Sequence, residues 1–452
     1  MKLFTSLNNR FFFALLVLLA ATSCQKEFLA EKPDRALLVP TQLEDFSAIL
    51  DGVQVFNQDY PALNSIASDD FFITDDGLQS LDFVEQAAYL WDASIFTGQT
   101  AVADWNYQYS KIFHANVVLD GLSELEVSGT NEQEYNRIKG AALFHRAYSY
   151  LELSQLFAMP YISSDDAGKP GLPLKLESDI NTPAVRSNLS DNYDQILRDL
   201  NEAEQLLPVT SEFPTRPNRL AAWALLARIY LSISDYDNAR LFADRCLQQH
   251  NTLSDYNFLD TTLDNPFPHV LTEGNEEVIY YATRVNYWFF SSARIGVDSD
   301  LYNSYDEEDL RKDLFFTTRD ENIHSLTGTY TGENSFFSGL AVDEILLIRA
   351  ECLARSGDID AALSDLNYLL THRYPESAFV AFESANQNLV LKRILLERRK
   401  ELIGRGIRWS DLRRLNRESG HEKTLVRNAF GNRYELAPNS PFYVFPFPDY
   451  EN

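Results

Sequence analysis

The sequence contains little cysteine and no apolar run long enough to cross a membrane. Only three cysteines occur among 452 residues, and two of them, Cys246 and Cys352, lie within apolar helical patterns. These two are expected to be buried free thiols, and a fold held together by disulfides is excluded. The apolar run at residues 11–21 would span only about half of the roughly 30 Å hydrocarbon core as a helix.

Basic side chains are too few for a nucleic-acid-binding protein. The chain has 39 Lys and Arg against 66 Asp and Glu, which gives a formal net charge of −27. Because nucleic acid phosphates require a basic surface, no nucleic-acid partner is expected. An acidic excess instead suits a solvated surface that faces the outside of a cell.

Sequence signatures of the common enzyme classes are missing. The chain has no His-Glu-x-x-His, Gly-x-Ser-x-Gly, Cys-x-x-Cys or phosphate-loop pattern, and its seven histidines are scattered. The acid-rich segment 298–309 lacks the glycine and ligand spacing of a calcium loop, which favours a solvated loop over a weak metal site. We therefore expect no catalytic residue, no cofactor and no metal.

The N-terminus has the pattern of a bacterial lipoprotein signal. Lys2 and Arg10 supply the positive end, the apolar run follows, and small residues at 21–23 lead into Cys24. Lipidation of Cys24 would attach the protein to a membrane through its acyl chains. An ordinary secretory signal with a chance cysteine is the alternative.

This pattern also divides the chain. Residues 1–23 are predicted to be a signal peptide, residues 24–40 a lipid-anchored tether, and residues 41–452 the folded domain. The Lys26-Glu27 pair after the cysteine resembles the signal that sends lipoproteins of Bacteroidetes-type bacteria to the outer face of the outer membrane.

Two segments share a repeat of the tetratricopeptide kind. Residues 219–248 read as two helices joined at Ser234-Asp235, and residues 342–370 repeat the frame with a turn at Gly357-Asp358. In each segment two alanines lie twelve positions apart, where small side chains let antiparallel helices approach closely. These alanines are Ala227, Ala239, Ala350 and Ala362.

Further copies are less regular. Residues 140–157 and 192–208 supply the two helices of a third copy, separated by a Pro- and Gly-rich insertion that is not helical. A fourth pair is suggested by residues 103–125 and 388–406. The fold class predicted is mainly α, with about four tetratricopeptide-like hairpins that carry long irregular insertions.

The longest irregular segment is residues 251–340, which is rich in aromatics and poor in helical periodicity. Residues 276–285 within it have the pattern of a short strand. Irregular segments of this length in a compact chain are usually functional.

Four passages resemble one family. They are CQKEFLAEKPD at 24–34, GKPGLPL at 168–174, ILLERRKELIGRGIRWSDLRRLN at 394–416 and FYVFPFPDYEN at 442–452. Together they resemble the SusD/RagB family, the surface lipoproteins that cap TonB-dependent transporters in Bacteroidetes. Arg405 departs from the family pattern, which usually has an acidic residue there.

The third passage can also be interpreted physically. Its arginines alternate with Glu and Asp around Trp409, a pattern that neutralises the charge. We expect a network that fixes the last helix to the C-terminal segment with the indole packed beneath it. A basic patch that binds phosphate is the alternative.

Aromatic residues in two loop segments are candidates for ligand binding. An aromatic ring can stack on the apolar face of a sugar while carboxylates bond its hydroxyls, and residues 68–94 and 286–296 have such residues. These segments occupy the positions from which members of the resembled family bind ligand. The candidates are Asp69, Asp70, Tyr89, Trp91, Tyr287, Trp288 and Phe289.

The family resemblance implies a function without chemistry. The protein would capture oligosaccharide at the cell surface and deliver it to a SusC-like TonB-dependent transporter of the outer membrane. Capture of peptides, as in the RagB branch, a surface glycoside hydrolase, and a protein-binding scaffold are the alternatives. Replacing Trp91 or Trp288 by Ala should abolish glycan binding, yet leave peptide capture or scaffolding largely intact.

Overall fold

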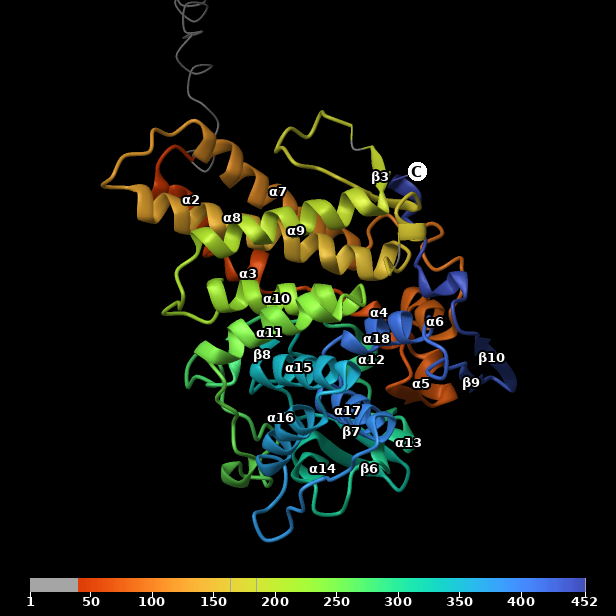
Figure 1. Ribbon diagram of the computed structural model, residues 1–452. Coiled ribbons are helices and arrows are strands. Elements are labelled where there is room, and N and C mark those ends of the chain that lie inside the picture. The colour runs from red at the N-terminus through yellow and green to blue at the C-terminus, as the bar shows by residue number, and fades with distance from the viewer. Residues whose placement is uncertain (1–39, 163, 184, 452) are drawn as a thin grey trace, which may run out of the picture. The chain divides into compact units, whose positions relative to one another are not determined.

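Figure 1 shows the computed structural model of the protein, in which residues 40–162, 164–183 and 185–451 are described. The predicted signal peptide at 1–23, the lipidation site Cys24 and nearly all of the tether at 24–40 lie outside the described residues, so these stay predictions. None of the described helices is long and apolar enough to cross a membrane.

Three helical hairpins form the centre of the fold, as the repeats predict. α8 packs against α9, α10 against α11, and α15 against α16; contacts between α9 and α10 and between α11 and α15 join the hairpins into one stack (Figure 1). Their bounds are α8 Glu132–Phe157, α9 Leu189–Leu206, α10 Arg219–Ser232, α11 Tyr236–Gln249, α15 Val342–Ser356 and α16 Ile359–Thr371.

The hairpin turns follow from local sequence. Asn218 caps the first turn of α10, its side chain accepting a hydrogen bond from the Ala221 N–H, and Asp235 caps α11 in the same way. The turn residues Ser234 and Gly357 both have positive φ, 61° and 87°. The four alanines of the twelve-residue offset are all fully buried, which confirms their role at the contact between helices.

The prediction of a fourth hairpin is wrong. α7 (Ala103–Ser123) packs against α8, whereas α17 (Gln387–Glu401) packs against α15 and α16, so the two helices cover opposite ends of the stack. The sequence pattern of a single helix does not distinguish one that covers a neighbouring hairpin from one that forms half of a pair.

Shorter helices and five two-stranded antiparallel sheets complete the described part of the chain. The helices are α2 Leu43–Leu50, α3 Val53–Phe56, α4 Leu63–Ala67, α5 Asp75–Gln79, α6 Phe83–Leu90, α12 Trp288–Ser291, α13 Ser299–Tyr302, α14 Leu310–Phe315 and α18 Ile407–Leu415, with 3-10 turns at Ser164–Asp166, Tyr256–Phe258, Pro441–Tyr443 and Asp449–Glu451. The strand pairs are β1 Phe71–Ile73 with β5 Ile295–Val297, β2 Pro170–Pro173 with β3 Arg186–Asn188, β4 Val278–Tyr280 with β8 Leu340–Ala341, β6 Phe316–Asp320 with β7 Ile323–Leu326, and β9 Leu425–Ala429 with β10 Asn432–Leu436.

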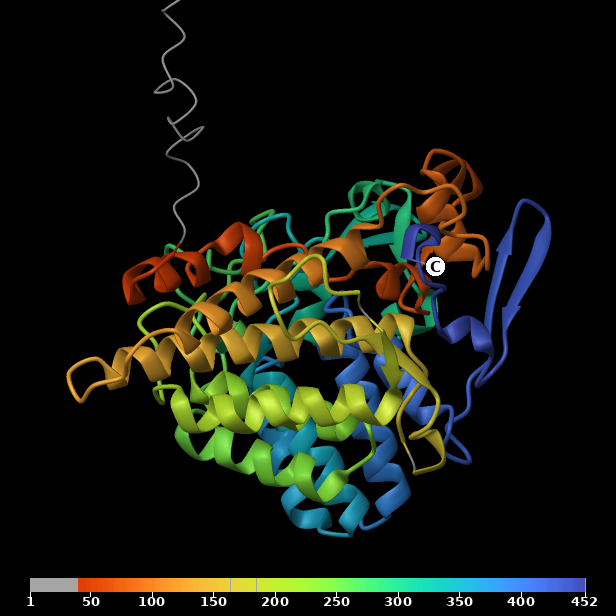
Figure 2. The ribbon, with the colours of Figure 1, turned by 90° about the horizontal axis from the view of Figure 1, so that it is seen from above.

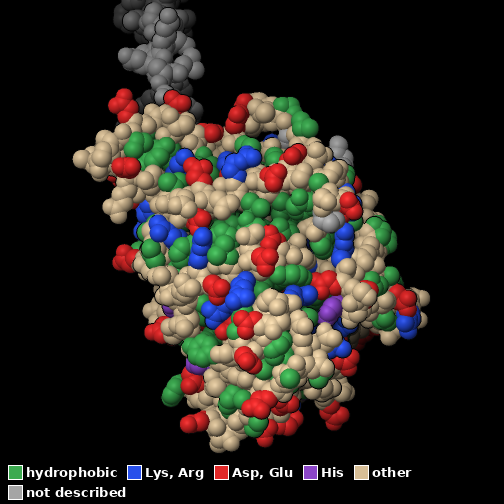
Figure 3. All heavy atoms as spheres, in the orientation of Figure 1, with side chains coloured by type: hydrophobic (Ala, Val, Ile, Leu, Met, Phe, Trp, Pro, Cys, Tyr) green, Lys and Arg blue, Asp and Glu red, His purple; other side chains and the backbone are tan. Residues whose placement is uncertain are grey.

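Several smaller predictions are confirmed. Cys246 and Cys352 are buried free thiols, and β4 is the short strand predicted within 276–285. Trp409 of α18 is buried, with its ring 4.7 Å from that of Tyr443, so the last helix is fixed to the C-terminal segment as expected. On the face shown in Figure 3, acidic and basic side chains lie interspersed.

A buried ion cluster joins the irregular segment 251–340 to the helical stack. Its side chains come from the irregular segment, from α15 and α17, and from the turns after α16 and α17, and all are buried. The members of the buried ion cluster are Glu277, Asp309, Arg311, Asp343, Arg373, Glu397, Lys400, Glu401 and Arg405.

Arg373 lies at the centre of the buried ion cluster. Its guanidinium lies 2.9 Å from Glu277 and 2.8 Å from Glu401, and also donates to the Ser254 carbonyl. Arg405, the departure from the family pattern, pairs with Asp343 at 2.6 Å. Three of these carboxylates lie within 4.8 Å of one another, as the ligands of a metal would. These carboxylates are Glu277, Asp343 and Glu401, and arginine guanidinium groups already pair with all three. The cluster therefore binds arginine side chains in the place that a metal ion would occupy.

Replacing Arg373 with Ala should lower the free energy of unfolding by about 3–5 kcal/mol, because two buried carboxylates lose a shared partner. Urea unfolding measures this loss. Arg433→Ala is the matched control, since Arg433 pairs with Glu435 at the exposed β-hairpin and its loss should cost less than about 1 kcal/mol. Equal effects of the two substitutions would contradict a central role of the buried ion cluster.

Glu277 should make stability depend on pH. Burial raises the pKa of Glu277 from 4.5 to about 7, aided by Asp343 and Glu401 and opposed by Arg373. Between those values the folded state holds a proton that the unfolded state releases, so this contribution to stability is lost as pH rises through about 7.

Glu277→Gln should therefore match the wild type near pH 5 and be more stable at pH 8, by an amount on the order of 1–3 kcal/mol. Urea unfolding at both pH values gives the difference in free energy of unfolding between the two proteins. Other titrating groups cancel in this difference, because both proteins contain them. Glu435→Gln, at an exposed site, serves as the control. Parallel pH curves for Glu277→Gln and the wild type would show that Glu277 is ionised throughout.

Candidate functional site

The two aromatic segments identified in the sequence lie side by side, although about 200 residues separate them. β1 pairs with β5, so that Phe71 is opposite Val297 and Ile73 opposite Ile295. Gly296 leaves room for the Phe72 ring that covers it, because a Cβ at position 296 would lie 2.5 Å from that ring. The early and late segments therefore form a single surface.

Glu85 fixes the relative positions of the two segments. Asp82 and Glu85 form a capping box at the start of α6, and the Glu85 carboxylate also accepts a 2.7 Å hydrogen bond from the Phe289 N–H. Burial raises the pKa of Glu85, an effect that the Phe289 N–H opposes. The start of α12 is thereby held against the start of α6.

This contact presents two aromatic rings to solvent. Trp288, the first residue of α12, is 77% exposed, and Phe83, the first residue of α6, is 48% exposed. An exposed ion pair, Asp76 with Arg294 at 2.9 Å, lies where α5 meets β5. We call Asp76, Phe83, Trp288 and Arg294 the Trp288 face. It combines apolar rings with groups that donate and accept hydrogen bonds.

Three of the predicted ligand-binding aromatics are engaged within the protein, two of them buried and the third, Tyr287, half-buried. Tyr89 and Phe289 are buried, with ring centroids 5.9 Å apart, and the Tyr89 hydroxyl accepts a hydrogen bond from the Ile73 N–H. The Tyr287 hydroxyl donates to Asp104 at 2.7 Å, and burial raises the pKa of Tyr287 well above its usual range. Tyr89 and Phe289 therefore support the Trp288 face and offer no ring to a ligand, whereas Tyr287 is held through its hydroxyl.

Trp91 is also engaged by the protein. It ends α6 in the left-handed conformation, with φ of 58°, and its indole N–H donates to the Ala67 carbonyl at 2.9 Å. The guanidinium of Arg427 lies 4.6 Å from the ring. Trp91 is half-buried, so it exposes a smaller fraction of its surface than Trp288 does.

Asp69 and Asp70 bind arginines of the passage at residues 394–416 rather than facing solvent. Arg408 lies 2.7 Å from Asp69, and Arg399 lies 3.0 Å from Asp70. Burial alone would raise the pKa of Asp69, but Arg408 and Arg399 hold it well below its usual range. With their charges neutralised, these carboxylates act as structural links from the early segment to the end of α17 and the start of α18.

The same passage leaves little room for a phosphate-binding patch. Arg398 pairs with Asp411 at 2.9 Å and Arg414 with Glu351 at 2.7 Å, besides the pairs of Arg399, Arg405 and Arg408 given above. The structural interpretation of this passage is the one that these contacts support.

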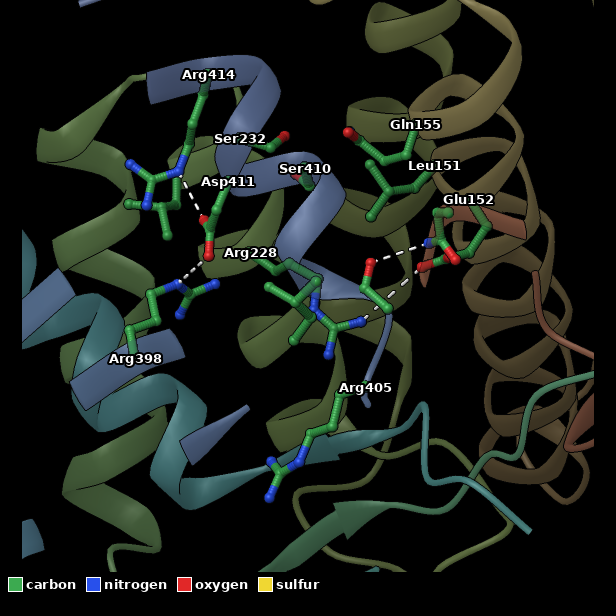
Figure 4. A pocket seen from close by; sticks show the side chains of 14 residues that line it. Leu151, Glu152, Gln155, Arg228, Ser232, Arg398, Arg405, Ser410, Asp411 and Arg414 are labelled. Carbon is green, nitrogen blue, oxygen red and sulfur yellow. Dashed lines mark hydrogen bonds and ion pairs between the residues drawn. The ribbon is translucent and has the colours of Figure 1, made fainter. Parts of the chain in front are cut away.

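A small polar pocket lies beside this network, between α8, α10 and α18 (Figure 4). Its volume is about 30 Å³, which suits one or two water molecules and not a sugar ring. Glu152 faces Arg228 across it at 4.0 Å, and burial raises the pKa of Glu152 to about 7, opposed by Arg228. The pocket is therefore too small to be the site of a sugar.

Comparison with known proteins agrees with the arrangement of the chain. A family model described as starch-binding and associating with the outer membrane matches residues 27–231, and a second, described as the SusD family, matches residues 342–449. The chain belongs to the SusD/RagB family. A SusD-like protein of Formosa agariphila is 24% identical over 413 residues, which cover 76% of this chain and 77% of the relative.

Solved SusD structures share the fold. A SusD superfamily protein from Bacteroides thetaiotaomicron superimposes with a TM-score of 0.71 at 21% identity, covering 91% of this chain and 97% of the other. A SusD-like carbohydrate-binding protein from Bacteroides vulgatus gives 0.68 at 20% identity, covering 91% and 96%. The mainly α, tetratricopeptide-like fold class predicted from the sequence is confirmed.

Phe83, Asp76 and Arg294 were not predicted from the sequence. The capping box of Asp82 and Glu85 is a sequence signal for the start of a helix. It makes Phe83 the first residue of α6. No local pattern pairs Asp76 with Arg294, because the partners come from segments far apart in the chain.

Proposed function

We propose that the protein captures oligosaccharides outside the cell on the Trp288 face and passes them, unaltered, to a SusC-like TonB-dependent transporter in the outer membrane. The observation that carries the proposal is the exposed indole of Trp288 on a surface that the protein itself holds in place. In this proposal, lipidation of Cys24 keeps the protein at the outer face of that membrane.

The chemistry of the Trp288 face suits a sugar. The axial C–H groups of a pyranose ring form an apolar plate that can stack on the indole, while Asp76 and Arg294 can bond its hydroxyls. Because Glu85 already fixes the start of α12, little conformational entropy is lost when a ligand binds. The family descriptions and the carbohydrate-binding relative support the same ligand class.

The proposal includes that the protein does not catalyse a reaction on the captured sugar. The two carboxylates of the predicted site, Asp69 and Asp70, are held by arginines, and Glu85 is bonded to backbone N–H groups. Asp76, on the face itself, is 79% exposed at its side chain and paired with Arg294. A glycosidase needs instead two carboxyl groups that flank the bond, one of them with a raised pKa.

Trp288→Ala should weaken oligosaccharide binding by at least about tenfold, since the stacking surface is lost. Calorimetric titration of the purified protein with maltoheptaose, cellohexaose, xylohexaose and mannohexaose measures this, and chromatography of each mixture detects any cleavage. Phe258→Ala is the matched control, because Phe258 is an equally exposed aromatic, 87% exposed, in a different segment. Its loss should leave binding unchanged.

The outcomes separate the alternatives. Binding of none of the four sugars, together with binding of peptides from a casein digest, would replace the proposal with peptide capture. Shortened oligosaccharides in the mixtures would make the protein a hydrolase. Unchanged glycan affinity in Trp288→Ala would retain the ligand class and reject the Trp288 face as its site.

A further inference from the structure

A second hollow lies on a different part of the described chain, between α7 and residues 173–180 of the split-hairpin insertion. Figure 2 shows the yellow insertion crossing over α7. The cavity has a volume of about 260 Å³ and also borders Glu451 near the C-terminus. It shares no helix or strand with the Trp288 face, and it is far larger than the polar pocket of Figure 4.

The floor of this cavity is apolar and aromatic. Tyr109 and Phe113, one helical turn apart on α7, line it together with Ile112, and Pro173 and Ile180 line it from the insertion. Phe113 is 38% exposed, so its ring is accessible from outside. An engineered cavity of about 150 Å³ holds benzene, so about 260 Å³ admits a six-membered ring with its substituents.

The wall contributed by the insertion is held in place. The buried Asn116 amide donates to the carbonyls of Lys175 and Glu177 at 3.0 and 3.2 Å, and the Tyr109 hydroxyl donates to the Pro173 carbonyl at 2.9 Å. The Ser178 N–H donates to the Asp120 carboxylate at 2.7 Å. The cavity is therefore formed in advance of any ligand.

The rim carries polar side chains that the protein leaves available. Among the described residues, no hydrogen bond or ion pair engages the Lys175 ammonium, the Glu177 and Glu451 carboxylates or the Ser178 hydroxyl. By contrast, the groups that support the wall, Asn116 and Tyr109, are fully used. A rigid apolar floor under a rim of free donors and acceptors matches a ligand that is apolar on its face and hydroxylated at its edge.

We propose that this cavity is a second carbohydrate subsite, in which Phe113 and Tyr109 receive one pyranose ring and Lys175, Glu177, Ser178 and Glu451 bond its hydroxyls. This inference rests on the proposed function, because it assumes that the ligand is a glycan. It adds that each protein molecule has two places for sugar, built from different elements.

Calorimetry and variants of three aromatic residues test the proposal, with the four oligosaccharides used above as probes. The wild type should bind the preferred oligosaccharide at two sites, and Phe113→Ala should weaken one of them by about tenfold or more. Trp288→Ala should leave the Phe113-dependent site. Tyr107→Ala is the matched control, since Tyr107 is 44% exposed on the same helix and does not line the cavity.

Thermal unfolding of each variant checks that the fold is intact. Each binding result then either supports or overturns the second subsite. One site that depends on Trp288 and not on Phe113 overturns this inference and leaves the proposed function standing. No sugar binding in the wild type overturns both. Loss of transporter binding in Phe113→Ala, with both sugar sites retained, would reassign the cavity to protein docking.

Discussion

The buried ion cluster is the constraint on which the rest of the structure depends. Nine charged side chains from distant parts of the sequence meet in the interior, and each would destabilise the fold if its partners were absent. Charges of this kind satisfy one another in a single geometry, whereas apolar side chains of similar size pack in many. The irregular segment 251–340 therefore has a defined position despite its few regular elements.

Two ion pairs outside the buried ion cluster connect it to the Trp288 face. Arg399, one residue before Lys400 of the buried ion cluster, binds Asp70, and Arg408 binds Asp69. These two aspartates directly precede β1, which pairs with β5 beside α12. The position of Trp288 is thus connected, through two ion pairs and a strand pair, to the centre of the molecule.

The sequence predicts what depends on neighbours along the chain. The alanines at 227 and 239 reveal a hairpin because the contact between its helices repeats with a fixed offset, and the positive φ of Gly357 follows from its place after a helix. Exposure of an individual aromatic has no such signature. Tyr89 and Trp288 were both predicted to bind ligand, yet Tyr89 is buried under Arg427, which lies 3.8 Å from its ring and comes from a segment far along the chain, whereas Trp288 is exposed.

The Trp288 face takes Asp76 and Phe83 from a part of the chain that a family model matches, and its other two residues from the unmatched interval. The two family models cover residues 27–231 and 342–449, which contain Asp69, Asp70, Arg399 and the other arginines of the passage. Trp288 and Arg294 lie in the interval between them. A change at Trp288 alters a ring that is 77% exposed and lies outside the buried ion cluster, so it removes none of the ion pairs that hold the fold. The side chains that hold the face, such as Glu85, and the side chains that it exposes, such as Trp288, are therefore separable by mutation.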